Sequence, residues 1–207
     1  MSRSQRDCTR VYLVRHGETD WNRDQRLQGT SDVSLNARGF GQAQELADHL
    51  SRLTIACVIT SPLVRAAATA ATLADRCRCP LVIDTRLREV DHGSWTARTL
   101  PDIARESPRL VTGGQLEPAA FDVSGGETLR DVFLRVSSAL ADIVARHDGQ
   151  SVVVVSHGVA LAIIECAAAG AAPSDYRDHL RPNATIAKLT FGQTRAHMAQ
   201  VELELSQ

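Results

Sequence analysis

Residues 151–156, Ser-Val-Val-Val-Val-Ser, are the feature that most restricts the possible folds of this chain. Four consecutive β-branched side chains predict a strand that is apolar on both faces, because neighbouring side chains of a strand point to opposite sides. Strands of this kind are typical of parallel sheets that carry helices on both faces. Residues 10–15, Arg-Val-Tyr-Leu-Val-Arg, predict a second central strand of the same type.

Strand and helix patterns alternate along the rest of the chain, which favours a parallel-rich sheet with helices on both faces. Asn36 and Thr128 are expected to cap two of the helices. The first of these helices is expected to bury Phe40, and the second to turn Arg135 outward. Helices are expected over residues 37–50, 63–77, 98–106, 129–144 and 159–170, a helical turn over 174–180, and further strands over 57–62, 81–84, 184–190 and 197–205.

Length and composition indicate a single domain that spans residues 1–207. The net charge of −1 argues against binding to nucleic acid or to anionic membranes, which favour a basic surface. The sequence contains no run of about 18 apolar residues, so no membrane-spanning helix is expected. The polar residues 1–9 are expected to be a disordered lead-in. The five scattered cysteines, without zinc-ligand spacing, indicate free thiols and a cytoplasmic location.

Residues 85–127 are the least regular part of the chain. Three prolines and two glycine pairs interrupt this segment, and both residue types favour turns and breaks. We expect one short helix within it and expect the segment as a whole to form the substrate-loop region.

Polar residues with possible chemical roles follow four of the expected strands. They are Arg15 and His16 after the first strand, Arg65 after the second, Glu89 after the third and His157 after residues 151–156. Ligands of parallel sheets bind beyond the carboxyl ends of the strands. We therefore expect these five side chains to gather at one edge of the sheet.

This set of side chains suits the transfer of a phosphoryl group. Two guanidinium groups match the oxygens of a phosphate dianion, and a helix N-terminus after His157 would add positive charge. A histidine can act as the nucleophile, and a carboxylic acid can protonate the leaving oxygen. Each residue alone is more often structural, so the joint pattern is what indicates chemistry through a phosphohistidine.

A zinc site built from His16, Glu89 and His157 is the rival interpretation of the same residues. The fixed positive charges of Arg15 and Arg65 disfavour it, because they would repel a metal cation. We therefore expect no metal and no other cofactor.

Six motifs resemble one known family when they are taken in order. They are RHGETDWN (15–22), LQGTSDVSLNARGFGQA (27–43), SPLVRAAATA (61–70), LREVDHGSW (87–95), SGGET (124–128) and VSHGVA (155–160). This order is similar to that of the histidine phosphatase superfamily, the phosphoglycerate mutase-like group, and fits its phosphatase branch. The resemblance implies a three-layer α/β/α sandwich with a mixed, mostly parallel sheet.

The resemblance also implies a role for each of the five residues at the strand ends. His16 is the nucleophile that becomes phosphorylated. Arg15 and Arg65 bind the phosphoryl oxygens, and His157 completes the pocket and stabilises the transferred group. Glu89 matches the general acid that later acts as a base for water.

Four further residues match positions that contact phosphate or substrate in the family: Asn22, Gln28, Gly158 and Glu127. The resemblance implies that Gly158 contributes its backbone amide. It places Glu127 at the entrance for the substrate.

The sequence departs from the family pattern just after the acid. Relatives often carry G-x-W-E-G where this chain has GSWTA, residues 93–97. Mutases of the family usually carry E-R-x-Y-G where this chain has EVDHG, residues 89–93. Hydrolysis of a small phosphomonoester is therefore the expected activity. A phosphoglycerate or phosphosugar mutase and a non-catalytic phosphate-binding module are the alternatives.

The identity of the substrate and the assembly state are left open by the sequence. Leu116, Trp95 and Phe121 are candidates for an apolar wall around the leaving group, but the two aromatic residues could equally belong to the core. Arg23 and Arg26 are expected at a solvated surface rather than on a second anionic group. Residues 199–205, AQVELEL, could pair across a homodimer.

Overall fold

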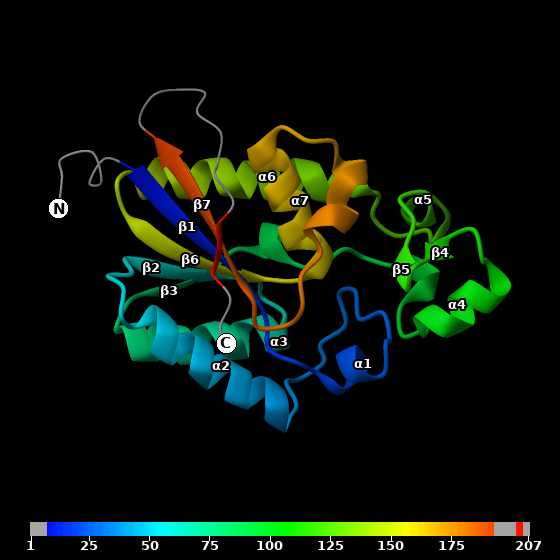
Figure 1. Ribbon diagram of the computed structural model, residues 1–207, viewed down its shortest axis with the longest axis horizontal. Coiled ribbons are helices and arrows are strands. Elements are labelled where there is room, and N and C mark those ends of the chain that lie inside the picture. Colours follow the sequence, from blue (N-terminus) through cyan, green and yellow to red (C-terminus); the bar gives the residue numbers. More distant parts are fainter. Residues whose placement is uncertain (1–7, 193–201, 205–207) are drawn as a thin grey trace.

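A mixed six-stranded sheet forms the centre of the computed structural model, which describes residues 8–192 and 202–204 (Figure 1). The spatial order is β3-β2-β6-β1-β7-β8. The first four of these strands are parallel, and β7 is antiparallel to β1. The strands are β1 (Cys8–Arg15), β2 (Cys57–Thr60), β3 (Leu81–Ile83), β6 (Ser151–Ser156), β7 (Ile186–Gly192) and β8 (Glu202–Glu204). This arrangement confirms the expected mixed, mostly parallel sheet.

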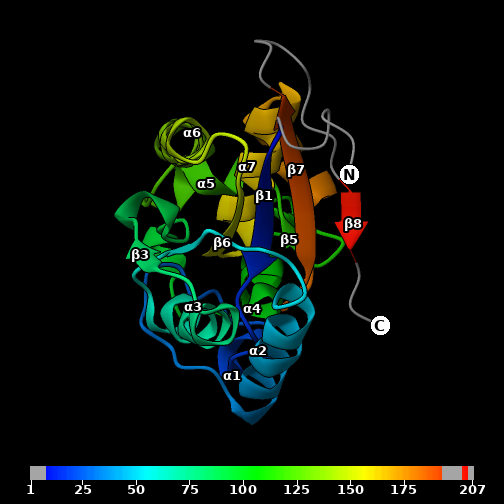
Figure 2. The same ribbon diagram turned by 90° about the vertical axis from the view of Figure 1, so that its left-hand side faces the viewer.

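Helices cover both faces of the sheet, as Figures 1 and 2 show from two directions. The helices α2 (Ala37–Leu50) and α3 (Val64–Cys77) pack on one face. The helices α6 (Leu129–Arg146) and α7 (Gly158–Ala169) and the 3₁₀ helix η4 (Pro173–His179) pack on the other. Val153 and Val154 are consecutive in β6 and belong to opposite core clusters, so β6 is buried on both faces as predicted.

The two predicted helix caps are present. The Asn36 side chain accepts a hydrogen bond from the amide of Gly39, 2.8 Å away, at the start of α2. Thr128 and Asp131 form a reciprocal capping box at the start of α6. Both caps satisfy amides that would otherwise lack a partner in the first turn of a helix.

Two predictions about helix faces are wrong. The Phe40 side chain is 51 % exposed instead of buried. Gly39, in the first turn of α2, packs directly against the backbone of Glu18, because a Cβ atom at Gly39 would lie only 2.1 Å from the Glu18 carbonyl oxygen. This close approach turns the next residue, Phe40, to solvent. Arg135 points inward and its side chain is only 11 % exposed, because backbone carbonyls of the neighbouring turn accept its hydrogen bonds.

The irregular segment 85–127 lies beyond the carboxyl ends of the parallel strands (Figure 1). Its small antiparallel hairpin turns through Gly113 and Gly114, whose φ angles of 58° and 72° favour glycine. The elements of this segment are η2 (Thr85–Leu87), η3 (Gly93–Trp95), α4 (Leu100–Glu106), β4 (Val111–Thr112), β5 (Gln115–Leu116) and α5 (Ala120–Val123).

The two ends of the chain are only partly covered by the described residues. Cys8 and Thr9 pair with Gly192 and Phe191 in the sheet, so the expected lead-in of residues 1–9 is too long. Of the expected strand 197–205, β8 alone is described, at the edge beside β7, and pairing across a homodimer stays a prediction.

No single described helix has the length and apolar character needed to cross a membrane. The helices α7 and η4 reach that length only together, across a bend of 111°.

Candidate active site

A cavity of about 490 Å³ opens at the carboxyl ends of the central strands. Arg15, His16, Arg65 and Glu89 line it, although they come from distant parts of the sequence. His157 is fully buried next to the cavity, with its ring centroid 5.1 Å from that of His16. The five side chains that were predicted to gather at one sheet edge therefore do so.

The register of the parallel strands brings the two histidines together. Arg15 of β1 is opposite Ser156 of β6 in the parallel ladder, so both strands end at the same level. The backbone amide of His16 then donates to the carbonyl of Ser156, 3.1 Å away. His157 is the next residue along the chain, which explains why both imidazole rings reach the same place.

The hydrogen bonds of His16 define the position of its ring proton. Arg65 Nε lies 3.2 Å from His16 Nε2, and a guanidinium group can only donate, so Nε2 must accept. The other ring nitrogen, Nδ1, then carries the proton and donates to the carbonyl oxygen of Gly17, 2.6 Å away. Burial, followed by the charges of Arg65 and Arg15, lowers the pKa of His16 well below its usual value. The imidazole is therefore neutral, with the lone pair of Nε2 toward the guanidinium of Arg65.

Arg65 holds a buried positive charge at the cavity. It donates to the carbonyl oxygens of Ser31 at 2.7 Å and Gly29 at 2.8 Å. Among the described residues no carboxylate forms an ion pair with it. Burial lowers the pKa of the Arg65 guanidinium to about 10, although the charge of Glu89 opposes this shift. An anion in the cavity could therefore form a direct ion pair with this guanidinium, which the described carboxylates do not form.

Arg15 contributes the second guanidinium group. Its Nη1 donates to the carbonyl of Arg181, while its Nε is buried without a hydrogen-bond partner. A Cβ atom at Gly158 would lie 3.4 Å from Arg15 Cζ, so the glycine at this position lets the guanidinium lie close to the start of α7. Burial lowers the pKa of Arg15, and the charge of Glu89 opposes this effect.

The Glu89 carboxylate lies at the N-terminus of α7. Its oxygens accept from the amides of Ala160 at 3.1 Å and Val159 at 3.3 Å, and from that of Val90 at 3.0 Å. The helix N-terminus favours a negative group at this place. These bonds orient the carboxylate at the cavity wall, near both arginines.

His157 is held by Ser61, whose Oγ lies 2.7 Å from Nε2. Its Nδ1 is buried without a partner, as are Arg15 Nε and Gln28 Oε1. Burial and the charge of Arg65 lower the pKa of His157 well below its usual value. Because buried polar atoms are normally satisfied in folded proteins, the unpaired atoms of the cavity-lining Arg15 and Gln28 indicate a site for a polar ligand.

Three of the four additional residues taken from the family resemblance line the cavity: Asn22, Gln28 and Gly158. Glu127 is not part of the cavity wall. It forms ion pairs with Arg88 and Arg135 instead.

The residues considered for the leaving-group side have separate locations. Leu116, Phe121 and Trp95 all belong to the hydrophobic core, and Leu116 and Phe121 also line the cavity, whereas Trp95 does not. Arg23 is exposed and pairs with nearby aspartates. Arg26 was expected at the surface, but it lines the cavity, lies over the ring of Trp21 and donates to the carbonyl of Ala97.

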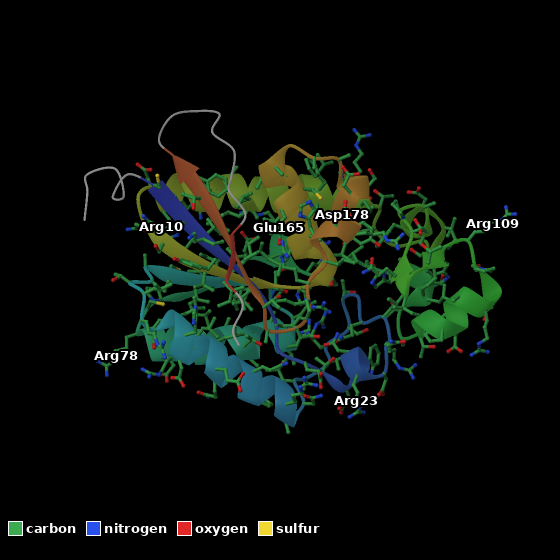
Figure 3. The ribbon with its side chains drawn as sticks, viewed as in Figure 1. Arg10, Arg23, Arg78, Arg109, Glu165 and Asp178 are labelled. Atoms are coloured by element: carbon green, nitrogen blue, oxygen red, sulfur yellow. The ribbon has the colours of Figure 1, made fainter. Side chains whose placement is uncertain are left out.

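Sequence reasoning missed the contribution of residues 176–183. Asn183 Nδ2 donates to the carbonyl of His16 at 3.0 Å and to Asn22 Oδ1 at 3.2 Å. Arg181, whose carbonyl supports Arg15, is itself bound by the buried Glu165 of α7, which Figure 3 labels inside the molecule. A single carboxylate in an otherwise apolar helix was the signal available for Glu165. Asn183 had no comparable signal.

No cluster of three or more histidine, cysteine, aspartate or glutamate side chains in the described part of the chain is arranged to hold a metal ion.

Residues 11–203 match the family model of the histidine phosphatase superfamily (branch 1), so the chain belongs to this superfamily. A curated relative from Enterobacter sp. (strain 638) carries the name "probable phosphoglycerate mutase GpmB". It is 36 % identical over 188 residues, which cover 89 % of this chain and 86 % of the relative.

Solved structures, among them that of a phosphatase, share the fold. The mycobacterial glucosyl-3-phosphoglycerate phosphatase in complex with VO3 is 29 % identical, with a TM-score of 0.82 over 95 % of this chain and 98 % of the other. YhfR from Bacillus stearothermophilus is 30 % identical, with a TM-score of 0.81 over 95 % of this chain and 96 % of the other. The names of the relatives thus include both phosphatases and mutases.

The buried histidines predict that stability falls in mild acid. Burial lowers the pKa values of His16, His92 and His157 in the folded protein, whereas the unfolded chain titrates near the usual 6.5. Below that pH the unfolded state binds protons that the folded state does not. The free energy of unfolding should therefore fall between pH 7.5 and 5, by up to about 2 kcal/mol for each histidine that stays neutral.

Urea denaturation at both pH values measures this difference. A His92→Gln protein, which retains His16 and His157, should show a smaller loss. Carboxylates with lowered pKa values contribute mainly at more acidic pH, so they do not account for a change above pH 5. A free energy of unfolding that stays constant or rises toward pH 5 would contradict this prediction.

Proposed function

We propose that this protein hydrolyses small phosphomonoesters through a phosphohistidine intermediate on His16. The observation that carries the proposal is the neutral His16 ring, whose Nε2 accepts from Arg65 in a cavity that also contains Arg15. The Nε2 lone pair becomes free for attack once the Arg65 guanidinium donates to the oxygens of a bound phosphate dianion instead of to His16.

The first chemical step forms the phosphohistidine. The substrate phosphate binds between Arg15 and Arg65, and Nε2 of His16 attacks the phosphorus atom. The bond from phosphorus to the leaving oxygen breaks, and Glu89, protonated in the complex with the substrate, gives its carboxyl proton to that oxygen so that a neutral alcohol departs. The arginines carry fixed positive charge where negative charge builds up in the transition state, which lowers the barrier.

The second chemical step releases phosphate. Water attacks the phosphorus atom and the Glu89 carboxylate takes its proton, while the bond between phosphorus and Nε2 breaks. Inorganic phosphate leaves, and His16 and Glu89 return to their starting protonation states. His157, fixed by Ser61, adds a polar group beside the phosphoryl site. Arg15 and Arg65 supply the positive charge, so neither step requires a metal ion.

A phosphoglycerate mutase is the second candidate, because curated relatives carry that name. The resemblance places Val90 where mutases usually carry an arginine, and this valine is apolar and fully buried. The position therefore offers no cation for a second anionic group of the substrate. This difference favours hydrolysis over transfer between two positions of a phosphoglycerate.

The cavity wall away from the phosphate site favours a leaving group with an apolar part. Apolar side chains on this wall would bury such a group at a gain of about 25 cal/mol for each Å² of apolar surface. They belong to Trp21, Leu27, Leu100, Leu116, Phe121 and Tyr176.

A cytoplasmic location is part of this proposal. All five cysteines are free, two of them buried, and free thiols persist in a reducing compartment.

Product analysis with 3-phosphoglycerate and a panel of alkyl and aryl phosphates tests the proposed function. Hydrolysis predicts release of inorganic phosphate without accumulation of 2-phosphoglycerate, and equal rates with and without EDTA. Interconversion of phosphoglycerates faster than phosphate release would establish the mutase alternative. Phosphate binding without turnover of any ester would establish the binding module.

A further inference from the structure

Arg135 of α6 uses every N–H group of its guanidinium. Nη1 donates to the carbonyl oxygens of Arg86 and Arg88, both at 2.6 Å. Nη2 donates to the carbonyl oxygen of Glu89 at 3.1 Å and to Glu127 Oε2 at 2.9 Å, and Nε donates to Glu127 Oε1 at 2.9 Å. A side chain with all five donors satisfied has a single orientation. The turn that carries Glu89 is therefore fixed to α6.

Glu127 holds the same turn from its other end. Its Oε2 accepts from the backbone amide of Asp91 at 3.1 Å, and its own amide donates to the carbonyl of Asp91 at 3.0 Å. Its Oε1 accepts from Arg88 Nη2 at 3.1 Å. The Glu127 and Arg135 side chains are 16 % and 11 % exposed, so water competes little for these bonds.

Two glycines allow the backbone of residues 124–127 to lie directly against the turn. A Cβ atom at Gly126 would lie 2.0 Å from the carbonyl oxygen of Asp91. At Gly93, a Cβ atom would lie 2.3 Å from the carbonyl oxygen of Ser124. Neither contact leaves room for a side chain. The backbone at Asp91 and at Gly93 is thus in tight contact with the backbone of residues 124–126.

We propose that Arg135 and Glu127 are positioning residues that hold Glu89 in place for proton transfer to the leaving oxygen. Neither side chain lines the cavity, so both act through the turn of residues 86–91 and not on the substrate. The inference rests on the proposed role of Glu89 as general acid. It replaces the substrate contact that the family resemblance suggested for Glu127.

Proton transfer requires close contact between donor and acceptor, so a small displacement of Glu89 costs rate. The cost depends on the leaving group. An alkoxide leaves only with a proton, whereas 2,4-dinitrophenolate leaves without one. A displaced acid therefore slows an alkyl phosphate and spares 2,4-dinitrophenyl phosphate. A loss of general structural integrity slows both esters alike.

Measurement of kcat/KM for these two esters tests the inference in Arg135→Lys and Glu127→Gln, because kcat/KM reports the steps up to the phosphohistidine. We expect a fall of about 10- to 100-fold for the alkyl ester, within the usual range for general acid catalysis. For 2,4-dinitrophenyl phosphate the fall should stay below about threefold. Inhibition by inorganic phosphate should be unchanged. Arg130→Gln, an exposed position on the same helix, is the matched control and should keep both rates.

A double variant provides a second readout. In a Glu89→Gln background the Arg135→Lys change should cost nothing further toward the alkyl ester, because the acid it positions is gone. Equal losses for both esters, or full additivity in the double variant, would overturn the positioning role while leaving the hydrolase intact. Absence of turnover of both esters by the wild-type protein would overturn the proposed function and this inference together.

Discussion

The His16→Ala protein is expected to lose at least about 10³-fold in kcat/KM toward every phosphomonoester that the wild-type protein hydrolyses. Alanine removes the nitrogen that forms the bond to phosphorus, and no other residue can replace it. The buried ring of His157 hydrogen-bonds to Ser61 through Nε2 and lies 5.1 Å away, so it does not occupy the position of the nucleophile. Phosphate release under steady-state conditions measures the loss.

Two controls make this result specific. The variant should still bind inorganic phosphate, because Arg15 and Arg65 remain. His147→Ala, at the C-terminal end of α6 and away from the cavity, should retain wild-type rates. Activity of His16→Ala within tenfold of wild type would show that another residue is the nucleophile.

The Arg65→Gln protein is expected to lose about 10²- to 10³-fold in kcat/KM, the usual cost of removing one group that stabilises charge in the transition state. It should also show a changed dependence on pH. Arg65 is one of the charges that lower the pKa of His16, so its removal raises that pKa. His16 then becomes protonated at a higher pH than in the wild-type protein, so the acid side of the pH–rate profile should move to higher pH in the variant. Burial and Arg15 still lower the pKa of His16 in the variant, so the shift measures the share that Arg65 contributes.

Arg76→Gln is the matched control for this prediction. Arg76 is on the same helix, is half exposed and pairs with Asp48 at the surface. Its replacement should leave kcat/KM and the pH profile unchanged. A pH profile of Arg65→Gln identical to that of the wild type would contradict the assigned influence of Arg65 on His16.

The central strands and the residues at their ends were predictable because burial on both faces leaves a strong pattern. Four valines in β6 cannot alternate with polar residues, so the strand must be covered by helices on both sides. The parallel register then brings residues after β1 and β6 together without further information. The positions of Arg15, His16 and His157 follow from this topology.

The support of Glu89 was not predictable, because it depends on contacts between distant segments. Arg135 lies between Val132 and Val136 at the border of the buried stripe of α6, where helical spacing does not decide its direction. The Arg135 side chain points inward because it donates hydrogen bonds to the carbonyl oxygens of Arg86, Arg88 and Glu89. Helical spacing likewise could not show that Gly39 would pack against the backbone of Glu18 and that Phe40 would face solvent.

The conformation of residues 93–97, which depart from the family pattern just after Glu89, also could not be predicted from the sequence. Ala97 stands where relatives carry glycine and adopts a φ angle of 68°, in the left-handed region that favours glycine. Its amide donates to the carbonyl of Leu27 at 2.8 Å, and its carbonyl accepts from Arg26. These contacts with the cavity wall hold the turn in place. They depend on residues about 70 positions earlier in the sequence.

Direct detection of the phosphoenzyme tests the central claim. Wild-type protein mixed with excess 2,4-dinitrophenyl phosphate and quenched within milliseconds should carry one phosphoryl group on the peptide that contains His16. Stability in alkali and loss in acid would identify the bond as one between phosphorus and nitrogen. Rapid turnover with no trapped phosphoryl group, or a phosphoryl group on another residue, would contradict the account.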